Sequence, residues 1–170
     1  MEAIEDRELA LNIRTDADDE ESQSVHDHYL IFHLGDEDYA VEIAYVTEIV
    51  GMQMITRIPD MPDYVRGVIN LRGQVIPVID VRTRFGLPFR EYDDRTCAVV
   101  ISISNKQFGL IVDVVDEVIN IPAERISSPM TAAFSQSTAF IKGVGRVEGD
   151  NKVKIILDAG KLLDSETILP

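Results

Sequence analysis

The stretch YAVEIAYVTEI, residues Tyr39–Ile49, decides the fold, because the chain repeats it as FGLIVDVVDEV, residues Phe108–Val118. When the two stretches are aligned without a gap, Glu48 falls on an identical residue, Glu117, and the aromatic Tyr39 falls on Phe108. Self-similarity of this kind indicates that one structural unit has been built twice.

Two further pairs extend the repeat. YVRGVINLRG (Tyr64–Gly73) aligns with FIKGVGRVEG (Phe140–Gly149), and PVID (Pro77–Asp80) aligns with IILD (Ile155–Asp158). Two copies are too few for a solenoid. The copies, at about 37–86 and 106–163, therefore predict two similar lobes that meet at a seam, where strands could be exchanged.

Short alternating segments separated by turn residues predict an all-β chain. The expected hairpins are Tyr29–Leu34 with Tyr39–Ile43, Val68–Leu71 with Val75–Ile79, Thr96–Ile103 with Gln107–Val112, and Val144–Val147 with Val153–Leu157. Short helices are expected at Val81–Phe85, capped by Asp80, and at Ala159–Leu163, capped by Asp158. The Ser/Thr-rich residues 122–139 read as irregular. The strand spacing favours two pseudo-symmetric antiparallel barrels of about five strands each.

The acidic charge is concentrated at the N-terminus. Residues 1–27 hold ten acidic residues and two arginines, so they carry −8 of the formal net charge of −14. Such segments are typically disordered, and we expect an ordered domain at 28–164 and a short tail at 165–170. Nucleic acid is an unsuitable partner because binding it needs a basic patch, and anionic membranes are disfavoured for the same reason.

Location is inferred from composition. One cysteine, Cys97, leaves no internal disulfide and fits a reducing compartment. No apolar run reaches the roughly 20 residues of a membrane span, and the acidic N-terminus does not resemble a signal peptide. We expect a cytoplasmic protein that does not insert into a membrane.

No enzyme signature, metal site or cofactor site emerges from the motifs. Cys97 lies in an apolar strand, which favours a buried and inert thiol. His26, His28 and His33 lack ligand partners at metal-binding spacing. The glycines at 143–149 lie in a predicted hairpin and do not open a helix, as a nucleotide loop would. Asp113 and Asp116 should face opposite sides of a strand, which argues against a catalytic acid pair.

Arg72 is the side chain that most suggests a binding function. It lies in the predicted turn Asn70–Gly73, and its counterpart in the second copy is Glu148. Arginine suits interfaces because its planar fork binds carboxylates at two points. We expect a contact from Glu48 to orient Arg72 at the seam. A pair this exposed adds under about 1 kcal/mol to stability, so its value would lie in positioning.

The stretch RGVINLRGQVIPVIDVRTRFGL, residues Arg66–Leu87, closely resembles the centre of CheW, the bacterial chemotaxis coupling family. Residues Ile43–Ile49, Ile58-Pro59 and Gly109–Val118 are similar to that family too, so the resemblance covers about 28–164. It implies two SH3-like five-stranded barrels and a non-enzymatic adaptor. Family members bridge methyl-accepting receptors, which are long helical hairpins, to the histidine kinase CheA, in arrays at the inner face of the membrane.

By position, the resemblance assigns receptor contacts to Val46, Glu48, Arg72, Gly109, Val115 and Val118, and backbone roles to Gly67 and Gly73. For the three valines, simple core packing is an equal alternative, since strand valines are usually buried. The regulatory domain of CheA has the same fold and is expected to dock on exposed apolar residues near the inter-repeat link, namely Phe85, Leu87 and Phe89.

Other functions stay open at this point. A coupling protein of a non-flagellar chemosensory pathway, such as one for pilus-based motility, would have the same signature. A small-barrel nucleic-acid binder and an enzyme with a cryptic site are remote alternatives, because the charge opposes the first and no catalytic constellation supports the second.

Overall fold

The computed structural model describes residues 26–128 and 140–162. The predicted acidic tail, apart from its last two residues, the C-terminal tail and the end of the last predicted helix lie outside these ranges. The elements, in chain order, are β1 (His28–Leu34), β2 (Glu37–Glu42), η1 (Ile43–Tyr45), β3 (Val46–Gly51), β4 (Val65–Leu71), β5 (Gln74–Asp80), α3 (Val81–Arg84), β6 (Cys97–Ile103), β7 (Lys106–Val112), β8 (Val114–Asn120), η2 (Ala123–Arg125), β9 (Ile126–Ser127), β10 (Ile141–Gly145), β11 (Lys154–Leu157) and α4 (Ala159–Leu162).

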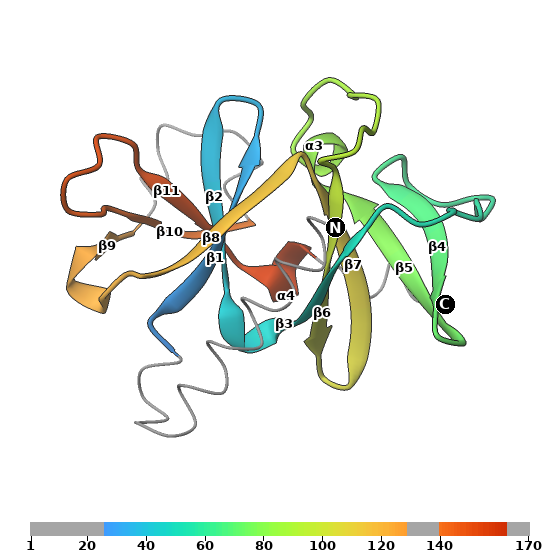
Figure 1. Cartoon of the computed structure of the whole chain (residues 1–170), viewed down its shortest axis with the longest axis horizontal. Helices are drawn as coiled ribbons and strands as arrows, with labels where there is room; N and C mark the ends of the chain where they lie inside the picture. Colours follow the sequence, from blue (N-terminus) through green and yellow to red (C-terminus); the bar gives the residue numbers. More distant parts are fainter. Residues whose placement is uncertain (1–25, 129–139, 163–170) are drawn as a thin grey trace.

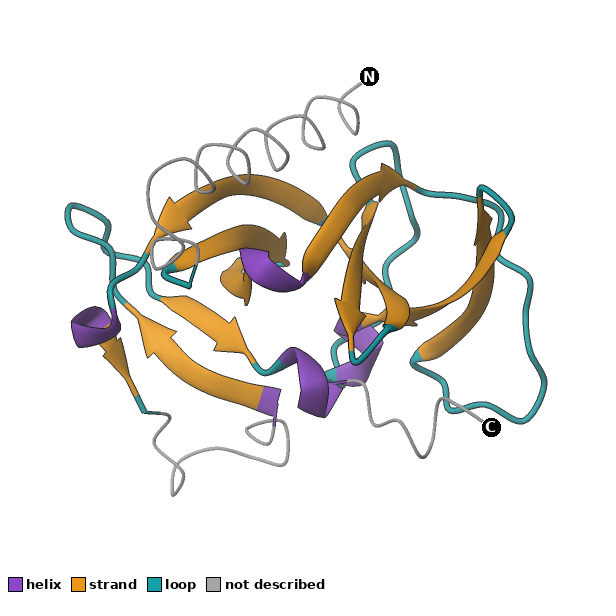
Figure 2. Ribbon diagram, turned by 90° about the horizontal axis from the view of Figure 1, so that it is seen from below, coloured by secondary structure: helices purple, strands orange, loops and turns teal. Residues whose placement is uncertain are grey.

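The strands form two sheets that lie side by side, with α4 between them (Figure 1). One sheet has the order β3-β6-β7-β5-β4, and the other has the order β8-β1-β2-β11-β10-β9. Their strands curve strongly when seen from below (Figure 2). The prediction of an all-β fold built from two small barrels is confirmed. The sixth strand of the second sheet is β9, which pairs with β10 at only two positions.

The two sheets repeat one pairing pattern. The hairpin β1–β2 matches β6–β7, and the hairpin β4–β5 matches β10–β11. The expectation of purely antiparallel barrels is wrong, because among the described strands each sheet contains one parallel pair, β2 with β11 and β5 with β7. β2 belongs to the first copy but lies in the sheet with β10 and β11 of the second copy. β7 belongs to the second copy but lies in the sheet with β4 and β5 of the first copy. The two copies therefore exchange their first strands.

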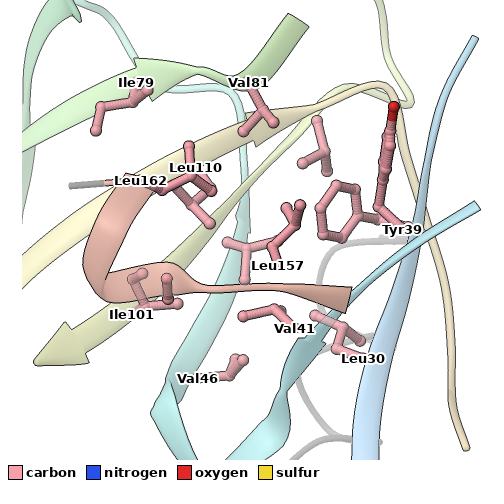
Figure 3. Packing of buried hydrophobic residues seen from close by; sticks show 14 of the residues in the cluster. Leu30, Tyr39, Val41, Val46, Ile79, Val81, Ile101, Leu110, Leu157 and Leu162 are labelled. Atoms are coloured by element: carbon pink, nitrogen blue, oxygen red, sulfur yellow. The ribbon is translucent and has the colours of Figure 1, made fainter. Parts of the chain in front are cut away.

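Among the described residues, buried side chains form three clusters, and the largest is shared by both sheets (Figure 3). The shared cluster takes residues such as Leu30, Val41 and Leu157 from one sheet and Val46 and Leu110 from the other. We call it the seam cluster. Each sheet keeps a smaller cluster of its own on its other face.

This arrangement explains why several strands read as continuous apolar runs. Successive side chains of a strand point to opposite faces. On β6, Val99 and Ile101 join the seam cluster, whereas Ala98 and Val100 join the cluster of their own sheet. A strand between two apolar clusters needs apolar residues at every position, so the simple polar–apolar alternation is lost.

Several local predictions need correction. The predicted strand Tyr39–Ile43 ends at Glu42, and a 3₁₀ turn then leads into β3, which the pattern did not separate. The strand predicted at Val144–Val147 is instead Ile141–Gly145, since Gly143 and Gly145 weaken the strand pattern. The segment predicted as irregular contains η2 and β9.

The helix predicted after Asp80 is present but ends one residue earlier, at Arg84. As predicted, the Asp80 carboxylate caps it, accepting a hydrogen bond from the Thr83 N–H at 3.2 Å. Within the two described ranges, no helix has the length and apolar character needed to cross a membrane.

Candidate partner-binding site

Arg72 lies at the tip of the β4–β5 hairpin, where the chain reverses within two residues. Leu71 pairs with Gln74, and Arg72 and Gly73 between them have positive φ values of 51° and 87°. Turns with two positive φ values match the twist of the flanking strands. The Asn70 side chain accepts a hydrogen bond from the Gly73 N–H at 2.9 Å, which fixes the turn. The hairpin therefore presents the Arg72 side chain at its end.

The contact expected between Glu48 and Arg72 is present as an ion pair. The Arg72 side chain is 64% exposed, whereas the Glu48 side chain is only 11% exposed. The hydrogen bond and the charge of Glu48 raise the pKa of the Arg72 guanidinium above its ordinary value. Glu48 on β3 is therefore a largely buried partner that holds Arg72 while leaving most of the charged guanidinium exposed to a partner protein.

Glu48 and Gly109 lie in one row across the first sheet. Glu48 pairs with Val100, Val100 pairs with Gly109, and Gly109 pairs with Val78. A Cβ at Gly109 would come within 2.8 Å of the Val78 side chain, a distance that real Cβ atoms do not tolerate. Gly109 is buried, so a partner could not touch it directly. Gly109 would affect binding only through the packing of the row of residues around it.

The three valines assigned by position separate into a buried one and two partly exposed ones. Val46 is fully inside the seam cluster (Figure 3). Val115 and Val118, on β8, pack against the same cluster and remain partly exposed. Val46 is therefore a core residue. Val115 and Val118 pack against the core and also have exposed surface that a partner could contact.

Gly67 and Gly73 both have backbone conformations that favour glycine, but only Gly67 also lacks space for a side chain. Gly67 has φ of 143°, and a Cβ there would lie 2.1 Å from the Thr56 carbonyl oxygen. The same approach recurs in the second copy, where a Cβ at Gly143 would lie 3.0 Å from the Ser127 carbonyl oxygen. Gly73 has open space around it, and only its φ favours glycine.

The three residues expected to face the kinase are not equally exposed. Leu87 and Phe89 are exposed, Phe89 by 51%. The expectation that Phe85 is exposed is wrong, because Phe85 is partly buried against the seam cluster. Its ring centroid lies 5.5 Å from that of Tyr39 and 5.9 Å from that of Phe140. Beside it, the Arg84 guanidinium lies between the Tyr64 and Phe140 rings, 4.0 and 4.2 Å from their centroids.

Several residues considered for chemistry have structural partners instead. Cys97 is buried, as predicted. His33 lies between two carboxylates, with Nδ1 2.7 Å from Asp38 and Nε2 3.1 Å from Asp116. Asp113 is paired with Arg82 and not with Asp116.

The buried ion pair between Asp38 and Lys154 was not predicted from the sequence. The two residues lie opposite each other on the parallel strands β2 and β11. The available signal was a lysine at an apolar position of the strand VKIIL. Its partner could not be named without the strand exchange.

Paired barrels that present an oriented arginine and partly exposed apolar strands are suited to binding other proteins. The chain belongs to the CheW family: the family model described as the CheW-like domain matches residues 28–167. Proteins of this family are non-enzymatic scaffolds or adaptors, and this chain is one of them.

Individual relatives agree over most of the chain. The chemotaxis protein CheW of Klebsiella aerogenes is 36% identical over 144 residues, which cover 85% of this chain and 86% of the relative. That of Bacillus subtilis is 34% identical over 138 residues, covering 81% and 87%. The crystal structure of the scaffolding protein TtCheW from Thermoanaerobacter tengcongensis superposes with a TM-score of 0.74 at 36% identity, covering 81% of this chain and 92% of that one.

Proposed function

We propose that this protein couples methyl-accepting chemotaxis receptors to the histidine kinase CheA in a bacterial chemosensory array. The observation that carries the proposal is the Arg72–Glu48 pair, because it directs an exposed guanidinium from the end of a rigid hairpin while contributing little to stability. The names of the relatives, which are chemotaxis and scaffolding proteins, support the same function.

For the receptor, we propose Arg72 and Glu48 as the charged contacts and Val115 and Val118 as apolar contacts. A helical receptor tip could place its apolar face, repeating at i, i+3, i+4 and i+7, on such residues. Val46 and Gly109 would support these contacts from below, because both are buried. The receptor would hold the protein at the inner face of the membrane.

For the kinase, we propose that the exposed side chains of Leu87 and Phe89 meet the regulatory domain of CheA. Aromatic and arginine side chains are enriched at the centres of interfaces. Here the Phe89 ring has the Arg66 guanidinium 4.8 Å from its centroid, which supplies both groups in one place. Phe85 would contribute only by supporting the seam.

The test is a titration of the full chain with two purified partners, a receptor cytoplasmic fragment and the CheA regulatory domain. We expect both to bind, and to bind together, because the proposed contacts involve different residues. Failure of both to bind at concentrations of about 100 μM, well above ordinary signalling affinities, would refute the proposal. Competition between the two partners would show that the surfaces are misplaced.

A further inference from the structure

Asp113 is a buried carboxylate that is not among the proposed receptor or kinase contacts. It stands between β7 and β8, where the chain passes from one sheet to the other. Its side chain is 9% exposed, and Asp116, three residues later, is occupied with His33. A buried charge is costly unless it is paired and hydrogen-bonded, so the contacts of Asp113 show what it holds in place.

The Asp113 carboxylate collects donors from three separate segments. Arg82 of α3 donates from Nε at 2.9 Å, and the N–H of Gly35, in the β1–β2 turn, donates at 2.9 Å. Arg90, in the segment between α3 and β6, places Nη1 3.2 Å away. Asp113 therefore joins elements of both sheets to the inter-repeat segment.

Residues 86–95 of that segment, which we call the inter-repeat loop, are tied down mainly through Arg82. Arg82 donates from Nη1 to the Pro88 carbonyl at 3.0 Å, and its own carbonyl accepts from the Leu87 N–H at 2.9 Å. Further along, the Tyr92 hydroxyl donates to Asp80 at 2.7 Å. With the loop held at these points by backbone and side-chain hydrogen bonds, Leu87 and Phe89 are exposed.

The hydrogen bonds between Asp113 and its partners favour the charged forms of Asp113 and Arg82. Burial of the Asp113 carboxyl raises its pKa, but the hydrogen bonds from Arg82 and the Gly35 N–H outweigh burial and hold the pKa below its ordinary value. The pKa of the Arg82 guanidinium is raised, chiefly by the same hydrogen bond. Both groups are therefore ionised at neutral pH.

We propose that Asp113 is a positioning residue, which holds the inter-repeat loop through Arg82 and Arg90 so that Leu87 and Phe89 face the kinase domain in a preformed arrangement. The inference rests on the proposed function. A preformed loop improves affinity because the partner does not have to order it on binding. Loosening the loop should thus weaken one partner and spare the other. The Arg72–Glu48 pair lies on other elements, and Val115 and Val118 are held by the pairing of β8 with β1, which does not involve the loop.

The test is Asp113→Asn in the full chain, which keeps the shape of the side chain and removes its charge. We expect its affinity for the CheA regulatory domain to fall about tenfold, within the usual range of coupling between sites. Its affinity for the receptor fragment should stay within about twofold of wild type, as expected for a site that shares no partner with Asp113. Amide hydrogen exchange should rise within residues 86–95.

The matched control is Glu42→Gln, which neutralises the carboxylate of another ion pair, Glu42–Lys142 at 3.1 Å, away from the loop. It should leave both affinities and exchange in the loop unchanged. If Asp113→Asn does not fold, Arg90→Ala answers the question, because Arg90 is 46% exposed and its loss leaves the contacts of Asp113 with Arg82 and Gly35 in place. The variant also removes the ion pair between Arg90 and Asp93 within the loop. We expect it to cost about two- to fivefold in kinase affinity, the effect of an exposed ion pair, and Arg95→Ala, an exposed arginine of the same loop, to cost nothing.

Two failures are distinguishable. If wild type binds neither partner, the proposed function falls and this inference falls with it. If wild type binds both, and the folded Asp113→Asn or Arg90→Ala variant binds the kinase domain as wild type does, only the positioning role of Asp113 is overturned.

Discussion

Arg72 and Glu148 occupy corresponding hairpin loops in the two copies and have opposite charges. Each is followed by a glycine with a positive φ, 87° at Gly73 and 82° at Gly149. Each also forms an ion pair with a residue of opposite charge: Arg72 pairs with Glu48, and Glu148 pairs with Arg125. The duplicated fold therefore offers two similar loops of which only one presents an arginine, and this difference allows a partner to tell the two lobes apart.

Arg72→Ala should weaken binding of the receptor fragment by about tenfold, as expected when an interface arginine is truncated. Its free energy of unfolding should stay within about 1 kcal/mol of wild type, because the side chain is largely exposed. Isothermal titration and urea unfolding measure the two quantities. Glu148→Ala is the matched control, and it should leave receptor affinity unchanged. Equal losses in the two variants would contradict a role specific to the first copy.

Gly67→Ala should destabilise the fold by about 3 kcal/mol, since overpacking adds to backbone strain. The new methyl group would meet the Thr56 carbonyl oxygen, and the edge segment that pairs with β4 would have to move. Gly73→Ala is the control: its new methyl group meets no atom of the described residues within 4 Å, so only the positive φ costs energy, about 1 kcal/mol. Thermal and urea unfolding decide the matter, and similar losses for the two would disprove the steric explanation.

The parts of this fold that could be predicted are those that local chemistry fixes. The hairpin at Arg72-Gly73 follows from Gly73, which accepts a positive φ, and the cap at Asp80 follows from a carboxylate beside a short helix. The contact between Glu48 and Arg72 could be proposed because the repeat singled out both residues. In each case the deciding residues lie within one copy.

The parts that could not be predicted depend on the exchange of strands between copies. The pairing of β2 with β11 brings Asp38 to Lys154, 116 residues away, and no local pattern records that meeting. Asp113 likewise reads as one acid among several until the passage from β7 to β8 places it beside Arg82. Phe85 looks like an exposed apolar residue near a link, and only the packing of the seam shows that it is partly covered.

Asp38→Asn should lower the free energy of unfolding at pH 7 by about 2 kcal/mol, because it leaves the buried Lys154 with one carboxylate partner in place of two. Burial raises the pKa of Asp38, but hydrogen bonds from Lys154 and His33 outweigh it, so the pKa of the folded state lies below the ordinary value. A lowered pKa stabilises the fold above about pH 4, and the stabilisation is lost as the pH falls through the lower, folded-state pKa.

The difference between wild type and Asp38→Asn should therefore still be present at pH 5 and shrink below about pH 4. Urea unfolding at four pH values between 7 and 3 measures it. Asp36→Asn, which changes an exposed acid of the neighbouring turn, should follow wild type throughout. A constant difference down to pH 3 would show that the Asp38 carboxyl is not stabilised in its ionised form.

Phe85→Ala and Phe89→Ala should separate folding from binding. Phe85 packs against Tyr39 and Phe140 at the seam, so its loss should cost about 2 kcal/mol of stability, less than for a fully buried ring. Phe89 is half-exposed and touches only Tyr92 and Arg66 among the ring contacts that the described residues make, so its loss should cost under about 1 kcal/mol. In return, Phe89→Ala should lower affinity for the CheA regulatory domain by about tenfold, as truncation of an interface aromatic does. Unfolding midpoints and titration of the kinase domain provide the comparison. Full kinase affinity in a folded Phe89→Ala variant would remove Phe89 from the proposed surface and leave Leu87 as its remaining candidate.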